Sequence, residues 1–340
     1  MGEGRYIYGI IKTNEGKSFG YCGINADEEV YTVDYQDIAC VVSDSPIQDY
    51  SSMLKETLGH LLIRHQTIIE KVMKDHTIIP MKFGTFVSDN DEVIEVLKRG
   101  YSQLKELFST VDEKIELDVA ATWNDLNSVM KEIGEEDKKI REFKTEIIKR
   151  PPSQTLQDRI KIGMMIKDAL DKRREKEQAY IINYLKKLII DFQKHQVMDD
   201  KMILNCAFLL EKRKEPDFDL KLEELDKEYK QKVNFRCVGT LPPYSFSTCQ
   251  LKKVGYSQID KARKLLDLGE KASLGKIKES YRKFAQKNHP DKHSNNTQFK
   301  EEFEKIIQAY KLLTSFYQEG DINFGNNKQR DFIVVEIIRV

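Results

Sequence analysis

The stretch SLGKIKESYRKFAQKN, residues 273–288, is followed by His289-Pro290-Asp291 and then, beyond a polar segment, by FKEEFEKIIQAYKLLTSF, residues 299–316. Apolar residues in both flanking segments recur every three or four positions, which is the period of one face of an α-helix. They are Ile277, Tyr281, Phe284 and Ala285 in the first segment, and Phe299, Phe303, Ile306, Tyr310 and Leu313 in the second. The pattern predicts two helices that pack antiparallel, with His-Pro-Asp in the loop between them.

The first of these helices has a basic solvent face. The basic residues that lie off its apolar face are Lys276, Lys278, Arg282, Lys283 and Lys287. From Gln258 to Tyr317 there are thirteen basic and eight acidic residues, a net charge of +5, although the whole chain is neutral with 56 of each. The basic charge is therefore local, and it suits an acidic protein surface or, alternatively, nucleic acid.

A further helix is predicted just before this pair. Ser257 is suited to cap it, and Ile259, Ala262 and Leu266 lie on one face. The resulting unit, residues 256–318, resembles the J domain of DnaJ-type co-chaperones, in which a basic helix leads into a His-Pro-Asp loop.

The resemblance to J domains implies a partner and a mechanism. The basic face is expected to dock on an acidic surface of the Hsp70 nucleotide-binding domain, and the loop to accelerate ATP hydrolysis by Hsp70. The Hsp70-binding residues implied are His289, Pro290, Asp291, Lys278, Arg282, Lys283 and Lys287.

The sequence also departs from the usual J-protein pattern. Leu266-Asp267-Leu268 stands where the family usually has Leu-Gly-Leu, and Ala262-Arg263 stands where it has an aromatic pair. The chain has neither a Gly/Phe-rich linker nor a cysteine-rich zinc region. We therefore expect client specificity to be located outside the J domain.

Residues 1–122 read as a first α/β domain. RYIYGII (5–11) and TIIPMKFGTFV (77–87) have strand character, and helices are predicted over about 52–75 and from 91 onward. KIELDVAATW (114–123) alternates apolar and polar residues and is expected to close the sheet. This order of elements predicts a ferredoxin-like sandwich.

Three histidines lie in this first domain. His60 and His65 are five residues apart, which is too far around a helix to share a metal ion. His65 falls on the apolar stripe of its predicted helix, so we expect a hydrogen-bonded core histidine. No metal site and no cofactor site is expected.

Residues 123–250 read as a second α+β domain. One charged helix is predicted over about 126–147, ended by Pro151-Pro152, and a long helix is predicted through about 155–193. KMILNCAFLLEK (201–212) is apolar and short enough for a buried strand. A further helix from Asp217 and a strand ending at Pro242-Pro243 complete the domain.

Four motifs in these two domains occur in a recognisable order. They are Tyr-Ile-Tyr-Gly-Ile (6–10), Ile-Ile-Pro-Met-Lys-Phe-Gly-Thr (78–85), Asp-Asp-Lys-Met-Ile-Leu-Asn-Cys-Ala-Phe-Leu-Leu (199–210) and Leu-Pro-Pro-Tyr-Ser-Phe (241–246). Together they resemble the gas vesicle protein L/F family (GvpL/GvpF). The resemblance implies an accessory protein of gas vesicle assembly that contacts the hydrophobic shell protein and other gas vesicle proteins.

The terminal motif also bears on where a client could bind. The rigid turn at Pro242-Pro243 presents Tyr244 and Phe246, which are either a contact surface or, as we favour, packing at the end of the second domain.

Bulk features predict a location in the cytoplasm, and the resemblance to the GvpL/GvpF family implies association with the gas vesicle. The five cysteines are scattered and form no Cys-x-x-Cys pair, which fits a reducing compartment. Neither a signal peptide nor an apolar run long enough to span a bilayer is visible. We expect neither nucleic acid nor a membrane as partner.

Residues 319–340 read as a polar linker and then a β-prone segment from Phe332 to Val340. We expect this strand to join a sheet edge of the first or second domain, with a client mimic or a dimer contact as the alternatives.

The expected fold class is α+β, with two α/β domains, an all-α J-domain helical hairpin and a C-terminal strand. The expected function is a gas vesicle assembly factor that recruits Hsp70 and has no catalytic residues. One alternative is a general J-domain co-chaperone with a different client. Another is an enzyme or RNA binder on a ferredoxin-like scaffold, for which the sequence has no catalytic constellation.

Overall fold

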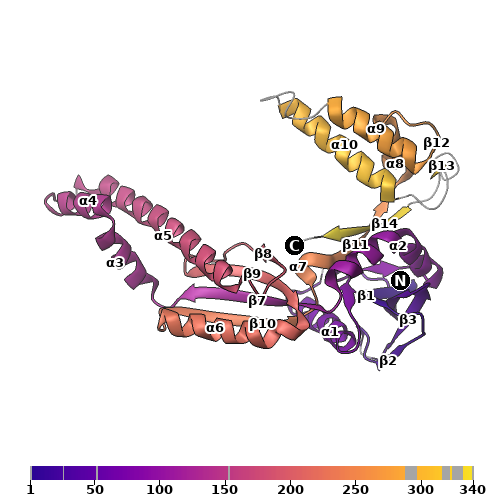
Figure 1. Ribbon diagram of the computed structural model, residues 1–340, viewed down its shortest axis with the longest axis horizontal. Helices are drawn as coiled ribbons and strands as arrows, with labels where there is room; N and C mark the ends of the chain where they lie inside the picture. Colours follow the sequence, from indigo (N-terminus) through magenta and orange to yellow (C-terminus); the bar gives the residue numbers. More distant parts are fainter. Residues whose placement is uncertain are drawn as a thin grey trace. The chain divides into compact units, whose positions relative to one another are not determined.

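The structure is a computed structural model (Figure 1) that describes residues 2–25, 27–50, 53–151, 154–287, 297–315, 322–323 and 332–338. The chain forms two compact units, the first within Met1–Asp112 and Ser247–Arg339 and the second within Glu113–Phe246. The two units are groups of segments in contact, and such groups do not show which segments fold independently. The expected four-part division of the chain therefore stays a prediction.

An antiparallel sheet forms the centre of the first unit. Its strands follow the order β2-β3-β4-β1-β5, and β6 also pairs with β1. The strands are β1 (Glu3–Lys12), β2 (Ser18–Tyr21), β3 (Glu29–Tyr35), β4 (Ile38–Pro46), β5 (Ile78–Pro80) and β6 (Phe86–Val87). β1 has paired neighbours on both edges and is buried along most of its length.

A helix covers each face of this sheet (Figure 1). Tyr6 and Tyr8 of β1 contact His65 on α1 (Lys55–Met73). Ile7 and Ile10 belong instead to the apolar cluster that includes the buried face of α2 (Asn90–Val111). The register of β1 shifts between Ile7 and Gly9, so Ile7 and Ile10 reach the same core although they are three residues apart, while Tyr6 and Tyr8 face α1.

The apolar stripe predicted for the first helix is only partly buried. His65, Ile68, Ile69 and Val72 of α1 are buried. Leu54, at the N-cap, is 78% exposed. The helix is therefore anchored through its C-terminal half.

The second unit has a four-stranded antiparallel sheet in the order β10-β7-β9-β8. Its strands are β7 (Lys114–Trp123), β8 (Asp191–Lys194), β9 (Met202–Glu211) and β10 (Val233–Leu241). The prediction that residues 114–123 close the first sheet is wrong. β7 is instead the partner of β9 over nine residue pairs, because its alternating apolar face is completed by the apolar run of β9.

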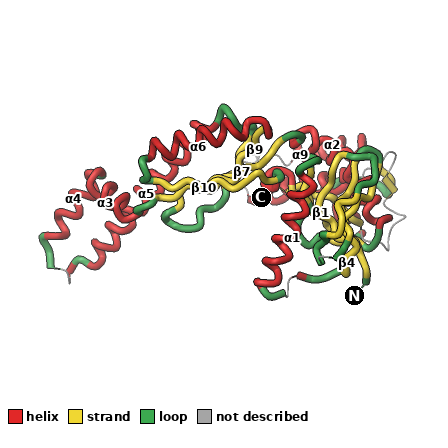
Figure 2. Tube along the Cα trace, turned by 90° about the horizontal axis from the view of Figure 1, so that it is seen from below, coloured by secondary structure: helices red, strands yellow, loops and turns green. Residues whose placement is uncertain are grey.

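Helices of the second unit are α3 (Leu126–Glu136), α4 (Lys138–Ile148), α5 (Leu156–Leu185) and α6 (Glu215–Tyr229), with short turns at η3 (Lys212–Lys214) and α7 (Tyr244–Ser247). α3 and α4 pack against each other and against α5 (Figure 2). The 30-residue α5 confirms the long helix, although it ends before β8 and not at residue 193.

The single helix predicted over about 126–147 is wrong, because α3 and α4 meet at Asp137. Its carboxylate accepts hydrogen bonds from the backbone N–H groups of Lys139 and Ile140, at 2.9 and 3.2 Å. Asp137 therefore ends one helix and caps the next, a position where aspartate is strongly favoured.

The J-domain region contains three described helices, α8 (Tyr256–Leu265), α9 (Leu274–Lys287) and α10 (Thr297–Ser315), and a short pair of strands, β12 (Lys271–Ala272) and β13 (Ile322–Asn323). Its core contains Ile259, Leu266, Ile277, Ile306 and Leu313. The predicted helices and the α+β class are confirmed.

The predicted C-terminal strand is confirmed as β14 (Phe332–Ile338), which pairs antiparallel with β11 (Thr248–Val254). β11 in turn meets the first sheet, since Lys82 N–H donates to the Cys249 carbonyl at 2.7 Å. The strand thus joins the first unit through β11. Its alternative roles as a client mimic or a dimer contact stay predictions.

Candidate functional site

The basic face predicted on the J domain is exposed on α9. Ile277 is buried on the opposite side of the helix, whereas Lys278 and Arg282, one turn apart, are exposed. Lys283 and Lys287, also one turn apart, are exposed as well. Each pair shares one face of the helix, as a separation of four residues requires, and all four expected Hsp70-binding residues on α9 reach solvent.

Packing fixes the orientation of this basic face. The Tyr281 ring stacks on Tyr310 of α10, with centroids 4.2 Å apart and planes at 21°. The Ser280 hydroxyl donates to the Leu266 carbonyl at the end of α8. Contacts to both neighbouring helices thus hold α9 with its basic residues outward.

Basic residues at the end of α8 are engaged differently. The carboxylate of Asp260 accepts from Arg263 and Lys264, each at 2.7 Å, and these bonds hold the pKa of that carboxyl below its usual range. By contrast, Lys278, Arg282 and Lys283 form no ion pair with any carboxylate in the described part of the chain. Their charge remains available to a partner.

The tripeptide His289-Pro290-Asp291 lies outside the described residues. α9 ends at Lys287 and α10 begins at Thr297, so the tripeptide falls between these helices in the chain, as predicted from the sequence. The roles of the three residues at an Hsp70 interface stay predictions.

Asp267, which stands where J domains usually have glycine, has a left-handed backbone with φ of +51°. Its N–H donates to the Lys264 carbonyl, and the N–H of Leu268 donates to the Arg263 carbonyl, each at 3.0 Å. These two bonds form a Schellman motif that ends α8. The fold therefore keeps the backbone that glycine favours, with aspartate in its place.

The first two sequence motifs meet inside the first unit. Tyr6 Oη lies 2.9 Å from Nδ1 of the buried His65 and accepts from the Gly84 N–H at 3.1 Å. Burial lowers the pKa of His65 to about 4, so the ring is neutral at pH 7. His65 is the predicted core histidine, and both motifs build the interior of the sheet.

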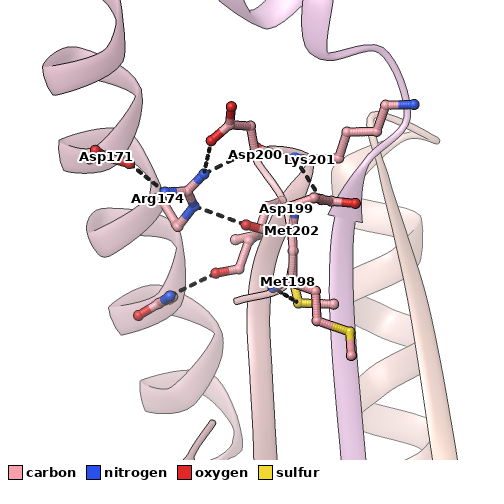
Figure 3. Close-up of polar contacts among 9 residues, drawn as sticks. Asp171, Arg174, Met198, Asp199, Asp200, Lys201 and Met202 are labelled. Atoms are coloured by element: carbon pink, nitrogen blue, oxygen red, sulfur yellow. Dashed lines mark hydrogen bonds and ion pairs between the residues drawn. The ribbon is translucent and has the colours of Figure 1, made fainter. Parts of the chain in front are cut away.

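The third motif forms the turn into β9, and Arg174 of α5 donates hydrogen bonds to its backbone (Figure 3). The guanidinium donates from Nε to the Met202 carbonyl at 2.9 Å and from Nη2 to the Asp200 carbonyl at 3.1 Å. Asp199 closes the turn by accepting from the N–H groups of Lys201 and Met202. The motif thus attaches α5 to the sheet.

The fourth motif is anchored by a buried carboxyl group. Glu116 of β7 accepts from the Ser245 N–H at 2.7 Å and from the Ser245 hydroxyl at 2.8 Å. Phe246 is buried against Ala207 and Leu209. The favoured prediction, that the motif packs the end of the second domain, is confirmed for Phe246.

A small cluster of polar groups, which was not predicted from the sequence, surrounds this anchor. His195 Nε2 lies 3.3 Å from the Ser245 hydroxyl, and Asp118 lies two residues from Glu116 on the same strand face. The two hydrogen bonds to Glu116 hold the buried Ser245 against β7. The sequence signal that could have predicted this cluster was the alternation of Glu116 and Asp118 with apolar residues in β7.

Burial changes the ionisation of both acids. It raises the pKa of Glu116 to about 7, against the opposing effect of the two Ser245 hydrogen bonds. Burial also raises the pKa of Asp118, and the nearby His195 opposes that rise. The charge of Asp118 also raises the pKa of Glu116, because the two carboxyl groups repel each other when both are charged.

The family of gas vesicle synthesis proteins GvpL/GvpF matches residues 4–248, which is most of the chain. The chain belongs to the GvpL/GvpF family. Gas vesicle protein F of a Nostoc species is 24% identical over 250 residues, which are 73% of this chain and 99% of that protein. Gas vesicle protein F1 of Halobacterium salinarum is 24% identical over 249 residues, 72% of this chain and 93% of that protein.

Solved structures of GvpL/GvpF proteins share the fold. The crystal structure of gas vesicle protein GvpF from an Anabaena species has a TM-score of 0.62 at 22% identity, covering 71% of this chain and 97% of that one. GvpF from Microcystis aeruginosa has a TM-score of 0.58 at 23% identity, covering 72% and 98%. All four motifs lie within the GvpL/GvpF match, and each has a packing role in the structure.

The region beyond the GvpL/GvpF match is similar to a different family. The DnaJ domain matches residues 263–317. Chaperone protein DnaJ of a Wolbachia species is 40% identical over 50 residues, which are 15% of this chain and 13% of that protein. The likeness is thus confined to the domain, and both predicted family resemblances are confirmed.

Two kinds of feature are absent from the described residues of this GvpL/GvpF protein. No helix among them is both long enough and apolar enough to cross a membrane. No group of three or more histidine, cysteine, aspartate or glutamate side chains in that part of the chain could hold a metal ion.

Proposed function

We propose that this protein is a co-chaperone of gas vesicle assembly, which binds the hydrophobic shell protein through its GvpL/GvpF part and recruits Hsp70 through its J domain. The observation that carries the proposal is the presence of both families in one chain. The GvpL/GvpF part selects the client, and the J domain selects the machine. The protein itself carries no catalytic site in this proposal and works in the cytoplasm at the growing vesicle.

The physical logic starts with the client. A protein that assembles into an apolar wall exposes aggregation-prone β surface before assembly. A partner that covers this surface slows incorrect pairing. Hsp70 adds cycles of binding and release driven by ATP, so a J domain on the same chain brings that cycle to the covered client.

Support for the Hsp70 half comes from the exposed basic face of α9. Lys278, Arg282, Lys283 and Lys287 present positive charge next to the predicted His-Pro-Asp loop. Such a surface speeds encounter with an acidic partner, and the effect weakens as salt is added.

The test is steady-state ATP hydrolysis by a DnaK-type Hsp70 with the full-length chain. The parent chain should stimulate hydrolysis, His289→Gln should abolish the stimulation, and Arg282→Glu should reduce it about tenfold or more, because charge reversal on a docking face costs on the order of 1–2 kcal/mol. Lys311→Glu is the matched control, since Lys311 is exposed on α10. Equal stimulation by all four chains would refute the assignment of the J domain.

Client choice needs a separate measurement. In a pull-down from a gas vesicle producer, the parent and His289→Gln chains should both recover shell protein. Recovery of Hsp70 without shell protein would overturn the gas vesicle client and leave a general co-chaperone.

A further inference from the structure

The last strand, β14, is shared between two apolar cores of the first unit. Ile333 and Val335 belong to the core of the first sheet and α2, whereas Val334 belongs to the core of the J domain. All three side chains are buried. Alternation along one strand thus places neighbouring residues in different cores.

A defined surface receives this strand. It consists of Cys249 and Leu251 on β11 and Gly100 and Leu104 on α2, and we call it the acceptor surface. β14 pairs with β11 over seven residues, from Val254 opposite Phe332 to Thr248 opposite Ile338. The acceptor surface therefore offers a strand edge together with an apolar floor.

Gly100 shows how closely the floor approaches the strand. A methyl group at this position would lie 3.0 Å from Cγ2 of Val335 and 3.1 Å from Cδ1 of Leu104. Glycine within a helix costs about 1 kcal/mol relative to alanine. Its presence in the middle of α2 is explained by a β-branched side chain that must lie against the helix backbone.

The J domain is inserted between the two strands of this sheet. β11 ends at Val254 and α8 begins at Tyr256, while β14 follows α10 in the chain. The GvpL/GvpF match ends at residue 248, so nearly all of this sheet lies beyond it. If β14 leaves the acceptor surface, Val334 leaves the core of the J domain at the same time.

We propose that the acceptor surface is a docking site for an extended aliphatic segment of another protein, and that β14 occupies it when that partner is absent. Strand addition supplies main-chain hydrogen bonds, and alternate side chains fill the floor. The occupant in the structure defines the chemistry, since Phe-Ile-Val-Val-Glu-Ile-Ile is an aliphatic, β-branched segment with one charge. Exchange of β14 for such a segment would signal to the J domain through Val334. This signalling role rests on the proposed function for the identity of the client, but the exchange itself needs neither shell protein nor Hsp70.

The test uses full-length chains and a fluorescent synthetic peptide with the sequence of residues 331–340. Val335→Asp in the chain should bind the peptide at least tenfold more tightly than the parent, because a charge in the floor displaces β14. Ile337→Asp is the matched control, because it adds the same charge to the same strand where the side chain is already 36% exposed. It should behave like the parent. Equal peptide affinity for the parent and Val335→Asp chains would overturn the proposal.

A second measurement tests the proposal on the parent chain, in case the Val335→Asp chain does not fold. In hydrogen exchange on the parent, the amides of β14 should exchange faster than those of β1, because β14 opens on its own. Equal protection of the amides in the two strands would overturn the proposal that β14 leaves the acceptor surface. Light scattering would also overturn the proposal if it showed that the parent is a dimer and that Val335→Asp is a monomer. In that case the acceptor surface would bind β14 of a second copy and not a segment of another protein.

Discussion

One of the departures of this J domain from the usual pattern is Asp267, and the structure shows why it is unfavourable. Asp267 has φ of +51° in the turn that ends α8. This backbone conformation is unfavourable in free energy for residues with a Cβ, although less so for aspartate than for most. The sequence departure was visible as Leu-Asp-Leu, but the backbone that makes it unfavourable is visible only in the fold.

Asp267→Gly should therefore stabilise the J domain by about 0.5–1 kcal/mol, because glycine adopts the left-handed region freely. Asp267→Ala is the contrasting variant and should destabilise it. The measurement is hydrogen exchange of the α8 amides in the full-length chain. A decrease in their protection with glycine would contradict the assigned role of this turn.

At the scale of elements, aspartate caps explain where the helical prediction failed. Residues 126–147 have a helical period throughout, yet Asp137 divides them into α3 and α4. The side chain satisfies N–H groups at the start of α4 that would otherwise lack partners. Periodicity does not reveal such a division, because both helices keep charged residues toward solvent.

Asp137→Ala should cost about 1 kcal/mol of α4 stability, whereas Asp137→Asn should keep most of it, since asparagine caps equally well. Hydrogen exchange of the first α4 amides measures the effect, with an expected loss of protection of about fivefold for alanine. Equal protection in the alanine and asparagine variants would show that the cap is unimportant.

At the scale of the whole molecule, the fluorescence of the single tryptophan can be used to follow unfolding of the second unit. Trp123, the single tryptophan, is 5% exposed and lies in β7 of the second unit. Its fluorescence follows unfolding of that unit, which also contains Glu116 and Asp118.

The second unit should lose stability as pH rises from about 5 to 8. Burial raises the pKa of Glu116 to about 7 in the folded chain, above the usual value of 4.5, so folding favours the protonated form. The stabilisation is complete below the unfolded pKa and disappears as pH rises through the folded one. Urea unfolding followed by Trp123 should show a decrease of about 1–3 kcal/mol over this range.

Glu116→Gln should flatten this pH dependence, because the amide does not ionise, and Glu175→Gln, at an exposed position of α5, should leave it unchanged. A stability that increases from pH 5 to 8 in the parent chain would contradict the assigned cause.

The sequence by itself determined the helices of the J domain, the long helix α5, the core position of His65 and both family resemblances. These features follow from local periodicity and from motifs, which neighbouring residues define. Only the tertiary structure decided that β7 belongs to the second sheet, that Glu116 binds Ser245 and that β14 joins two cores. Each of these depends on which distant segments meet, and strand pairing between distant segments leaves no local pattern in either strand alone.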